Sequence, residues 1–355
     1  MELSLVIPTY NESENISALV QKILEEFKEN NILGEIILVD DNSPDGTGDI
    51  LDVLKKKNRN IKVIHRKGKL GLSSAVVEGW KVSSGEVLGV MDADLSHPPE
   101  KIHKLFNPIK SGNSDFTIGS RYVDGGKILG WNFKRKIMSR TATFFAKPFT
   151  CVKDPMSGFF MIKRDCISFS KINSKGFKIL LEVILKASYK KIMEVPITFT
   201  DRTKGKSKAG SSEIFDYIKN LFGYRKYIRK GFREFFKFAV VGFIGTVINL
   251  AVLYSLTEFF GVYYLLSAFF AFIIAVVNNF VWNKIWTFKE NVGYKTIRKF
   301  GQFLFVSVIA LGVNLSFLYL FTEMLGIYYL FSQIFAIAIS LMVNFVGNKF
   351  WTFRK

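Results

Sequence analysis

The sequence predicts an α/β domain with a mostly parallel, Rossmann-like sheet, followed by an all-α domain of four membrane-spanning helices. Three observations support this fold class. Short apolar strands alternate with amphipathic helices over residues 1–120. Four apolar runs, each close to the roughly 20 residues that cross a bilayer core, occupy the last third of the chain. These four runs also form a tandem repeat.

The composition is that of a soluble domain joined to an apolar one. The 355 residues are 49% hydrophobic and 22% charged, and the mean hydropathy is +0.20. This apolar content excludes intrinsic disorder. Two cysteines, Cys151 and Cys166, are too few for a disulfide scaffold or a zinc ribbon. The net charge of +19 would suit binding either to nucleic acid or to an anionic membrane surface. The positions of the basic residues along the chain must distinguish these two partners.

The N-terminal domain begins with a buried strand. We do not expect its first ten residues to be a signal peptide, because Glu2 stands where a basic region would and Pro8 ends the apolar run. The predicted strands are 3–7, 35–39, 61–65, 86–91 and 116–119. The predicted helices are about 13–30, 46–57, 71–83 and 99–110. Ligands of such sheets bind where the strands end, which is where the sequence carries its acidic pairs: Asp40 with Asp41, and Asp92 with Asp94.

A metal site is predicted at Asp92-Ala93-Asp94. The chain has no G-x-G-x-x-G motif between the first strand and helix, and Gly205-Lys206-Ser207 lacks the upstream glycine of a Walker loop. Two carboxylates around a turn can instead converge on one hard cation that bridges diphosphate oxygens. Taken alone this motif is weak, and its position after an apolar strand strengthens it.

The C-terminal domain is predicted to span the membrane at about 235–257, 262–283, 300–322 and 327–347. Phe235–Phe288 aligns without a gap with Phe300–Phe353, so each repeat is a two-helix hairpin. Because each repeat has an even number of spans, both repeats cross the membrane in the same orientation. The pseudo-axis that relates them is expected to run along the membrane normal. The connection between the repeats and the tail are basic, whereas the turns at Gly261 and Gly326 carry only Glu258 and Glu323. Basic loops stay in the cytoplasm, so both termini and everything before residue 235 are expected there.

A strongly basic, aromatic segment precedes the first span. It includes Lys219, Arg225, Arg229, Phe222 and Tyr224. This pattern suits helices at the lipid headgroup layer, with a nucleic-acid patch as the alternative. The predicted domains are therefore a catalytic domain at 1–210, basic amphipathic interfacial helices at 211–233 and a transmembrane domain at 234–355.

Ordered motifs then point to a family. PTYNE at 8–12, VDDNSPDGT at 39–47, KLGLSSAVVEG at 69–79, MDADLSHPPE at 91–100 and GSRY at 119–122 resemble family-2 glycosyltransferases of the GT-A fold. GWNFKRKIMSR at 130–140, DPMSGFF at 154–160 and DRTKGKSK at 201–208 narrow the resemblance to dolichol-phosphate mannosyltransferases. The repeat at 235–355 resembles the four-span GtrA-like domain.

The resemblance implies roles for residues that match the motifs. The nucleotide would contact Pro8, Tyr10, Glu12, Val39, Asp41, Asp92, Ala93 and Asp94, with Arg202 and Lys208 folding over the donor diphosphate. Mg²⁺ or Mn²⁺ would be held by Asp92, Asp94 and Ser96, although Ser96 stands where many relatives have Gln. The acceptor phosphate is already an anionic nucleophile, so the site needs cations rather than a strong base. The catalytic residues expected are Asp94, Arg121, Arg135, Ser139 and Arg140. Asp154 is expected to orient its neighbours, and Glu182 is a second polar outlier.

The function implied is inverting transfer of mannose from GDP-mannose to dolichyl phosphate at the cytoplasmic membrane face, with no nucleic-acid partner. Transfer from UDP-glucose or another nucleotide sugar to the same kind of acceptor is the nearest alternative. A flippase for the lipid-linked sugar is a second alternative, although the spans contain few of the ionisable groups that coupled transporters need. A processive polysaccharide synthase is disfavoured because no Q-x-x-R-W motif is present.

Overall fold

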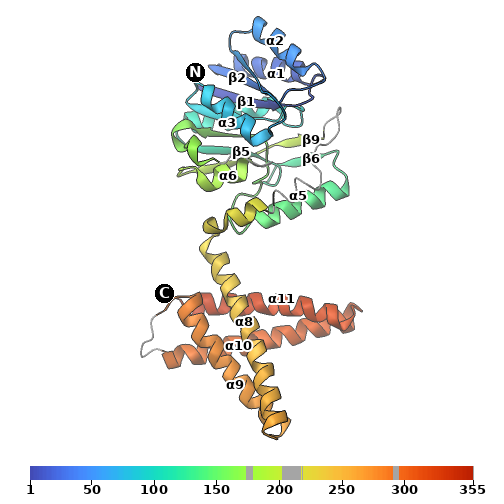
Figure 1. The fold of residues 1–355 in the computed structure, drawn as a ribbon, viewed down its shortest axis with the longest axis vertical. Coiled ribbons are helices and arrows are strands. Elements are labelled where there is room, and N and C mark those ends of the chain that lie inside the picture. Colours follow the sequence, from blue (N-terminus) through green and yellow to red (C-terminus); the bar gives the residue numbers. More distant parts are fainter. Residues whose placement is uncertain (173–178, 202–216, 218, 291–295, 355) are drawn as a thin grey trace. The chain divides into compact units, whose positions relative to one another are not determined.

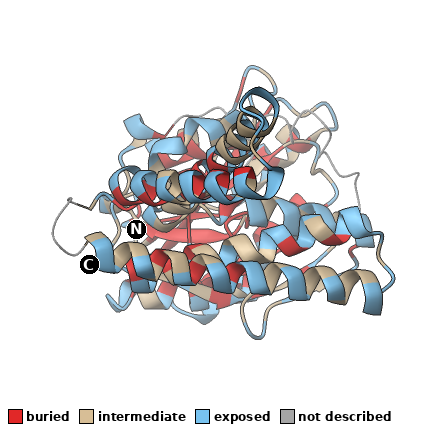
Figure 2. Cartoon of the chain, turned by 90° about the horizontal axis from the view of Figure 1, so that it is seen from below, coloured by how far each residue is buried: buried red, intermediate tan, exposed pale blue. Residues whose placement is uncertain are grey.

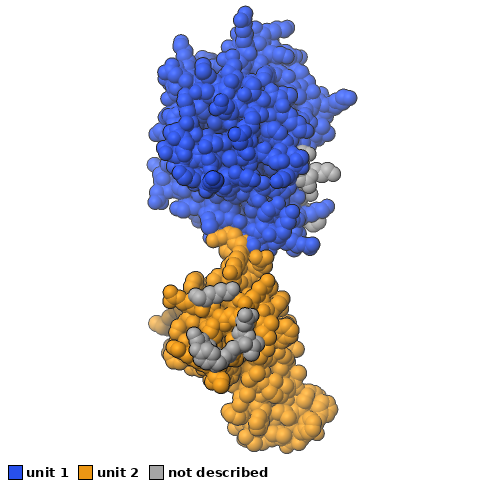
Figure 3. Space-filling model, turned by 90° about the vertical axis from the view of Figure 1, so that its left-hand side faces the viewer, with its two compact units in different colours: residues 1–228 blue, residues 229–355 orange. Residues whose placement is uncertain are grey.

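The chain forms two compact units, residues 1–228 and 229–355 (Figure 3). The structure, a computed structural model, describes residues 1–172, 179–201, 217, 219–290 and 296–354. We describe each unit by itself.

Unit 1 is built on a seven-stranded, mostly parallel sheet with the strand order β3-β2-β1-β4-β7-β5-β8 (Figure 1). Its strands are β1 (Leu3–Thr9), β2 (Gly34–Asp40), β3 (Ile61–His65), β4 (Val87–Val90), β5 (Phe116–Ser120), β7 (Phe160–Lys163) and β8 (Ile192–Pro196). The five strands predicted from the sequence are all present. β7 is antiparallel to both β4 and β5 and separates them, which the alternation of elements did not predict.

Helices cover both faces of this sheet. On one face, α1 (Ile16–Glu29), α2 (Thr47–Lys57) and α4 (Ile102–Lys110) pack on side chains such as Leu5 and Leu38. On the other face, α3 (Leu72–Val82) and α6 (Ile179–Lys186) pack on Val6 and Val39. Successive residues of a strand point to opposite faces, so strands covered on both sides are apolar throughout. The central strands are buried accordingly (Figure 2).

A smaller feature lies beyond the strand ends. β6 (Lys127–Leu129) pairs with β9 (Thr198–Thr200) in a separate two-stranded sheet. α5 (Phe133–Ala146) follows β6, and the Asn132 side chain caps it by accepting a hydrogen bond from the amide of Arg135 at 2.9 Å. Several large apolar side chains of α5 are exposed, among them Phe133 and Phe144.

Unit 2 consists of α8 (Lys230–Tyr254), α9 (Tyr264–Trp282), α10 (Thr296–Tyr319) and α11 (Tyr329–Gly347). Four helical stretches are long and apolar enough to cross a membrane: Lys230–Phe259, Tyr264–Thr287, Thr296–Met324 and Tyr329–Thr352. The four predicted apolar helices are thus present. Six phenylalanines form the buried core of this unit: Phe238, Phe280, Phe288, Phe303, Phe345 and Phe353.

Candidate active site

Several of the predicted site residues lie at one edge of the main sheet. β1, β2 and β4 are mutually parallel, so their carboxyl ends share this edge. β5 lies two strands beyond β4, with β7 between them. Because β7 is antiparallel to both, β5 is parallel to β4, and the carboxyl end of β5 lies at the same edge. This edge therefore brings together Tyr10, Asp41, Asp92 and Arg121, each of which follows one of these strands.

Two predicted nucleotide contacts lie within the strands themselves. Pro8 is part of β1 and pairs in register with Val39 of β2. The Val39 side chain is fully buried in the sheet core, and its carbonyl accepts a hydrogen bond from Thr9 Oγ1 at 3.2 Å. The Val39 side chain is therefore not available to a ligand at the strand ends. Glu12 lies in the following loop, where its amide donates to Thr47 Oγ1 at 2.9 Å.

Asp41 is held by a residue that the sequence analysis did not single out. The Arg66 guanidinium forms a buried ion pair with Asp41 Oδ1, and the Gly71 amide donates to Asp41 Oδ2 at 2.9 Å. Arg66 also donates to Ser74 Oγ at 2.5 Å, and only 2% of its side chain is exposed. The pairing of β2 with β3 explains why Arg66 and Asp41 meet. His65 pairs with Asp40, so the residues that follow β3 and β2 must be neighbours.

The loop from Arg66 to Gly71 also reaches Tyr10. The Nζ atom of Lys69 lies 4.5 Å from the centre of the Tyr10 ring, a distance typical of a cation–π contact. The loop thus contacts both Tyr10 and Asp41, two side chains predicted to bind the nucleotide.

The acidic motif forms a tight turn directly after β4. Leu95 adopts a positive φ of 58°, and Asp94 Oδ1 accepts a hydrogen bond from the Ser96 amide at 3.1 Å. Ala93 and Asp94 are largely buried, whereas 31% of the Asp92 side chain is exposed. The Asp92 carboxylate is therefore partly accessible after the end of β4, and the Ser96 amide holds the Asp94 carboxylate.

His97 and Gly158 fix the orientation of Asp92. His97 is buried between the rings of Phe159 and Phe199, and its Nε2 lies 3.2 Å from Asp92 Oδ2. A Cβ atom on Gly158 would lie 2.2 Å from the same oxygen, so any larger residue there would displace the carboxylate. The sequence analysis had assigned His97 no role at the site.

These residues fit a divalent cation shared with a diphosphate. Among the described residues, no group of three or more His, Cys, Asp or Glu side chains gathers as a complete metal site. Ser96 Oγ is buried without a hydrogen-bond partner in the described part of the chain. Mg²⁺ is commonly bound by one or two carboxylates together with substrate phosphates. Asp92, Asp94 and the Ser96 hydroxyl match that partial donor set.

Arg121 lies at the end of β5, where Asp154 holds it. The Asp154 carboxylate, fully buried, accepts hydrogen bonds from Arg121 Nε and Nη2, both at 2.7 Å. Burial works against the charged form of Arg121, and the carboxylates of Asp154 and Asp92 outweigh it, so the pKa of the guanidinium lies above its ordinary value. The expectation that Asp154 orients a neighbour is confirmed.

α5 carries the remaining predicted acceptor residues. Arg135 and Ser139 are one helical turn apart on the same face. Arg135 forms an ion pair with Asp201 and lies over the Trp131 ring at 4.6 Å, and Ser139 Oγ is 2.8 Å from the Tyr122 hydroxyl. Arg140 is exposed on a different side of the helix. Arg202 and Lys208 lie outside the described residues.

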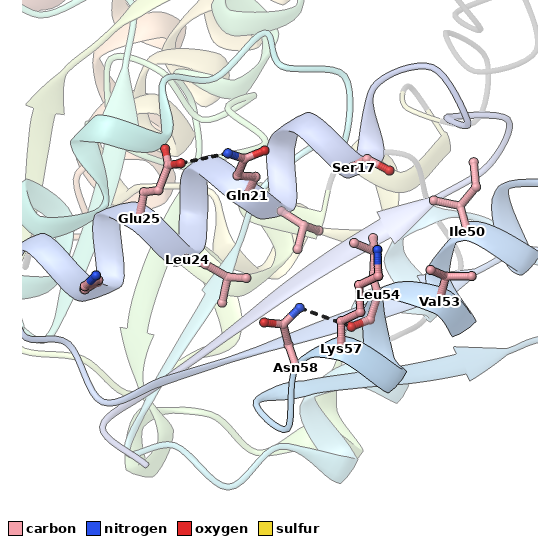
Figure 4. A pocket seen from close by; sticks show the side chains of 11 residues that line it. Ser17, Gln21, Leu24, Glu25, Ile50, Val53, Leu54, Lys57 and Asn58 are labelled. Carbon is pink, nitrogen blue, oxygen red and sulfur yellow. Dashed lines mark hydrogen bonds between the residues drawn. The ribbon is translucent and has the colours of Figure 1, made fainter.

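A separate surface pocket lies between α1 and α2 (Figure 4). Its volume is about 440 Å³, and its lining includes Leu24, Ile50 and Leu54. Because none of the predicted site residues lines it, this pocket is distinct from the strand-end site.

Comparison with known proteins agrees with this architecture. Residues 4–168 match the family model described as glycosyl transferase family 2, and residues 237–353 match the GtrA/DPMS transmembrane domain. The chain is 39% identical to the dolichol-phosphate mannosyltransferase of Pyrococcus furiosus over 98% of both chains. It is also 39% identical to the Saccharomyces cerevisiae enzyme of that name, over 62% of this chain and 86% of the yeast chain. Among solved structures, the glucosyl-3-phosphoglycerate synthase of Mycobacterium tuberculosis is 16% identical with a TM-score of 0.46, over 62% of this chain and 79% of that chain.

The match to the Pyrococcus relative extends through both units, and the two family models account separately for the sheet domain and for the four long helices. The chain is thus an integral membrane enzyme, and it belongs to the dolichol-phosphate mannosyltransferase family of glycosyltransferases.

Proposed function

We propose that this enzyme transfers mannose from GDP-mannose to dolichyl phosphate, with inversion at the anomeric carbon and release of GDP. The observation that carries the proposal is the proximity of an acidic turn to a buried cation. The turn holds Asp92 and Asp94; His97 contacts Asp92, and His97 and Arg121 both pack on the ring of Phe199. Family membership supports the choice of donor and acceptor.

The donor half of the site consists of the strand ends and the acidic turn. Tyr10, Glu12 and Asp41 contact the base and ribose, together with Pro8 and Val39, and Ala93 lies with Asp92 and Asp94 at the diphosphate. Asp92, Asp94 and Ser96 hold Mg²⁺ or Mn²⁺. When bound, the cation offsets charge on the diphosphate and on the departing GDP. For Arg202 and Lys208, which lie outside the described residues, we propose a role in binding that diphosphate, as the family resemblance implies.

The acceptor half needs positive charge and correct alignment. An oxygen of the lipid phosphate attacks C1 of mannose while the bond from C1 to the diphosphate oxygen breaks, and that electron pair leaves with GDP. Arg121 and Arg135 bind the phosphate, the Ser139 hydroxyl donates to it, and Arg140 adds positive charge from a different side of α5. Their task is to hold the nucleophile in line with C1. The fixed orientation of Arg121 on Asp154 supports this role, because a clamped cation need not reorganise during reaction.

The membrane unit places the chemistry at the lipid. We propose that both termini and the catalytic unit are cytoplasmic, and that the spans keep the active site beside the dolichyl phosphate headgroup. The basic loops at one end of the spans support this orientation.

The test is transfer of radiolabelled mannose from GDP-mannose to dolichyl phosphate in detergent with Mg²⁺ or Mn²⁺, run beside UDP-glucose. Asp94→Asn should lower the rate about 100-fold or more, because it removes a cation ligand. Asp52→Asn is the matched control, since Asp52 is an exposed carboxylate paired with His65 away from the site. Transfer from UDP-glucose alone would overturn the mannose assignment, and an unchanged rate in Asp94→Asn would overturn the metal site.

A further inference from the structure

The chain leading into the membrane unit packs against the helix that carries the acceptor residues. We call Tyr217 and residues 219–228 the strap. Three side chains of the strap, Tyr217, Leu221 and Tyr224, lie at helical spacing and face one way. They pack around a small buried cluster formed by Ala146 of α5, Leu181 of α6 and Met156. Basic side chains of the strap and Phe222 are exposed instead.

Tyr217 binds the α5 backbone directly. Its hydroxyl donates a hydrogen bond to the carbonyl of Ala142 at 2.8 Å. Burial raises the pKa of the Tyr217 phenol, so the hydroxyl stays protonated as a donor. Ala142 lies one turn beyond Ser139, near the carboxyl end of α5. The strap therefore fastens the half of α5 that follows the predicted phosphate-binding residues.

Tyr224 binds the other helix of the cluster and explains the polar outlier Glu182. Glu182 is buried on α6 and forms an ion pair with Lys186. Tyr224 lies against this pair: the Glu182 carboxylate is near its hydroxyl, and the centre of its ring lies 5.9 Å from Lys186 Nζ. Burial and the nearby Glu182 carboxylate both raise the pKa of the Tyr224 phenol. This contact gives the strap a second docking point, on α6.

The opposite half of α5 is fastened by contacts within the catalytic unit. The Asn132 cap, the ion pair from Arg135 to Asp201 and the Tyr122–Ser139 contact hold it. With Tyr217 at the other end, α5 is held by polar contacts along its length. Because its outer face exposes large apolar side chains such as Phe133 and Phe144, the unit's own core does little to fix the helix.

We propose that Tyr217 and Tyr224 are positioning residues for the acceptor, which hold α5 so that Arg135 and Ser139 meet the lipid phosphate. This inference rests on the proposed function. The strap continues directly into α8, which begins at Lys230. The residues that fix the acceptor helix are therefore adjacent in the chain to the first membrane span, and the catalytic unit includes residues up to 228.

The experiment compares Tyr217→Phe with Tyr189→Phe in the full chain. Tyr189 is a matched control, because it too is a partly buried phenol whose hydroxyl donates to a helix carbonyl, that of Ile184 at 3.0 Å. That bond lies in the core beside α6 and not on α5. Each variant removes one hydroxyl hydrogen bond and keeps the ring. Two quantities are measured: amide hydrogen exchange of peptides covering 133–146, and KM for dolichyl phosphate and for GDP-mannose.

We expect Tyr217→Phe to speed exchange in α5 and to raise KM for dolichyl phosphate about twofold to tenfold, with KM for GDP-mannose unchanged. Tyr189→Phe should change neither α5 exchange nor acceptor KM. Tyr224→Phe should behave like Tyr217→Phe. Unchanged exchange in α5, or faster exchange with an unaltered acceptor KM, overturns the inference. If the wild-type chain shows no mannose transfer, the proposed function fails, and the exchange data still decide whether the strap holds α5.

Discussion

The aromatic rings of Phe288 and Phe353 stack with their centroids 4.6 Å apart and an angle of 19° between planes. They are equivalent positions of the two membrane repeats. Two other ring contacts, both with centroids 5.6 Å apart, form a matched pair under exchange of the repeats: Phe238–Phe345 and Phe280–Phe303. The two hairpins therefore pack around a pseudo-twofold axis that passes between Phe288 and Phe353.

This symmetry predicts equal consequences at equivalent positions. Phe288→Ala and Phe353→Ala each remove one ring from the same buried stack, so each should destabilise unit 2 by about 2 kcal/mol or more. The two losses should agree within about 0.5 kcal/mol. Unfolding of the membrane unit in mixed detergent measures both, with the exposed Phe350→Ala as control. A large loss at only one of the two positions would contradict the symmetric core.

His97 should control metal affinity through Asp92. Partners that orient a metal ligand typically contribute 10- to 100-fold in affinity, so His97→Ala should weaken Mn²⁺ binding in the presence of GDP by about that factor. Electron paramagnetic resonance of free and bound Mn²⁺ measures it. His103→Ala is the control, because His103 Nδ1 contacts the Glu26 carboxylate at 2.6 Å away from the site. Equal Mn²⁺ affinity in the His97→Ala and His103→Ala variants would show that His97 does not orient Asp92 for metal binding.

Gly158 should tolerate no side chain. In Gly158→Ala the new methyl group would lie 2.2 Å from Asp92 Oδ2, so the carboxylate must move, and mannose transfer should fall at least about tenfold. Gly48→Ala is the control, since its nearest neighbours would be 3.5 Å away, an ordinary contact distance. The steady-state rate of mannose transfer is measured for both variants. Full activity in Gly158→Ala would mean that the Asp92 orientation is not needed.

Removing Asp154 should destabilise unit 1 as well as slow transfer. Asp154→Ala leaves the buried Arg121 guanidinium without its carboxylate, which typically costs about 3–5 kcal/mol. Asp52→Ala breaks an exposed pair with His65 and should cost less than about 1 kcal/mol. Thermal unfolding followed by tryptophan fluorescence compares the two. Similar losses would mean that the Arg121–Asp154 pair contributes no more than an exposed pair.

Glu35 should make unit 1 sensitive to acid. Burial works to raise the pKa of Glu35, but hydrogen bonds from Lys62, Ser4 and Ser84 outweigh it and lower the pKa from 4.5 to about 2. Because the folded pKa is below the unfolded value, the stabilisation is complete above pH 4.5 and is lost as the pH falls towards 2. The stability difference between wild type and Glu35→Gln should therefore shrink across this range. A difference independent of pH would contradict the assignment.

Much of the fold could be predicted because its signals are local. The apolar strands at 3–7 and 35–39, the helices between them and the four apolar spans each carry their own periodicity or length. β7 was missed, because a short apolar run such as Phe160–Lys163 does not reveal which strands it will separate. Strand order depends on pairing between distant segments, and no local pattern records it.

For the site, the sequence by itself determined the chemistry available. It placed Asp41, Asp92 and Asp94 after strands, which made them neighbours at one sheet edge, and it identified the cations Arg121 and Arg135. Only the tertiary structure decided what holds them: Arg66 on Asp41, His97 on Asp92, Asp154 on Arg121 and Tyr217 on α5. The reason is physical. A strand's end is set by its own residues, whereas a buried polar side chain takes its partner from segments that meet only when the sheet and helices pack.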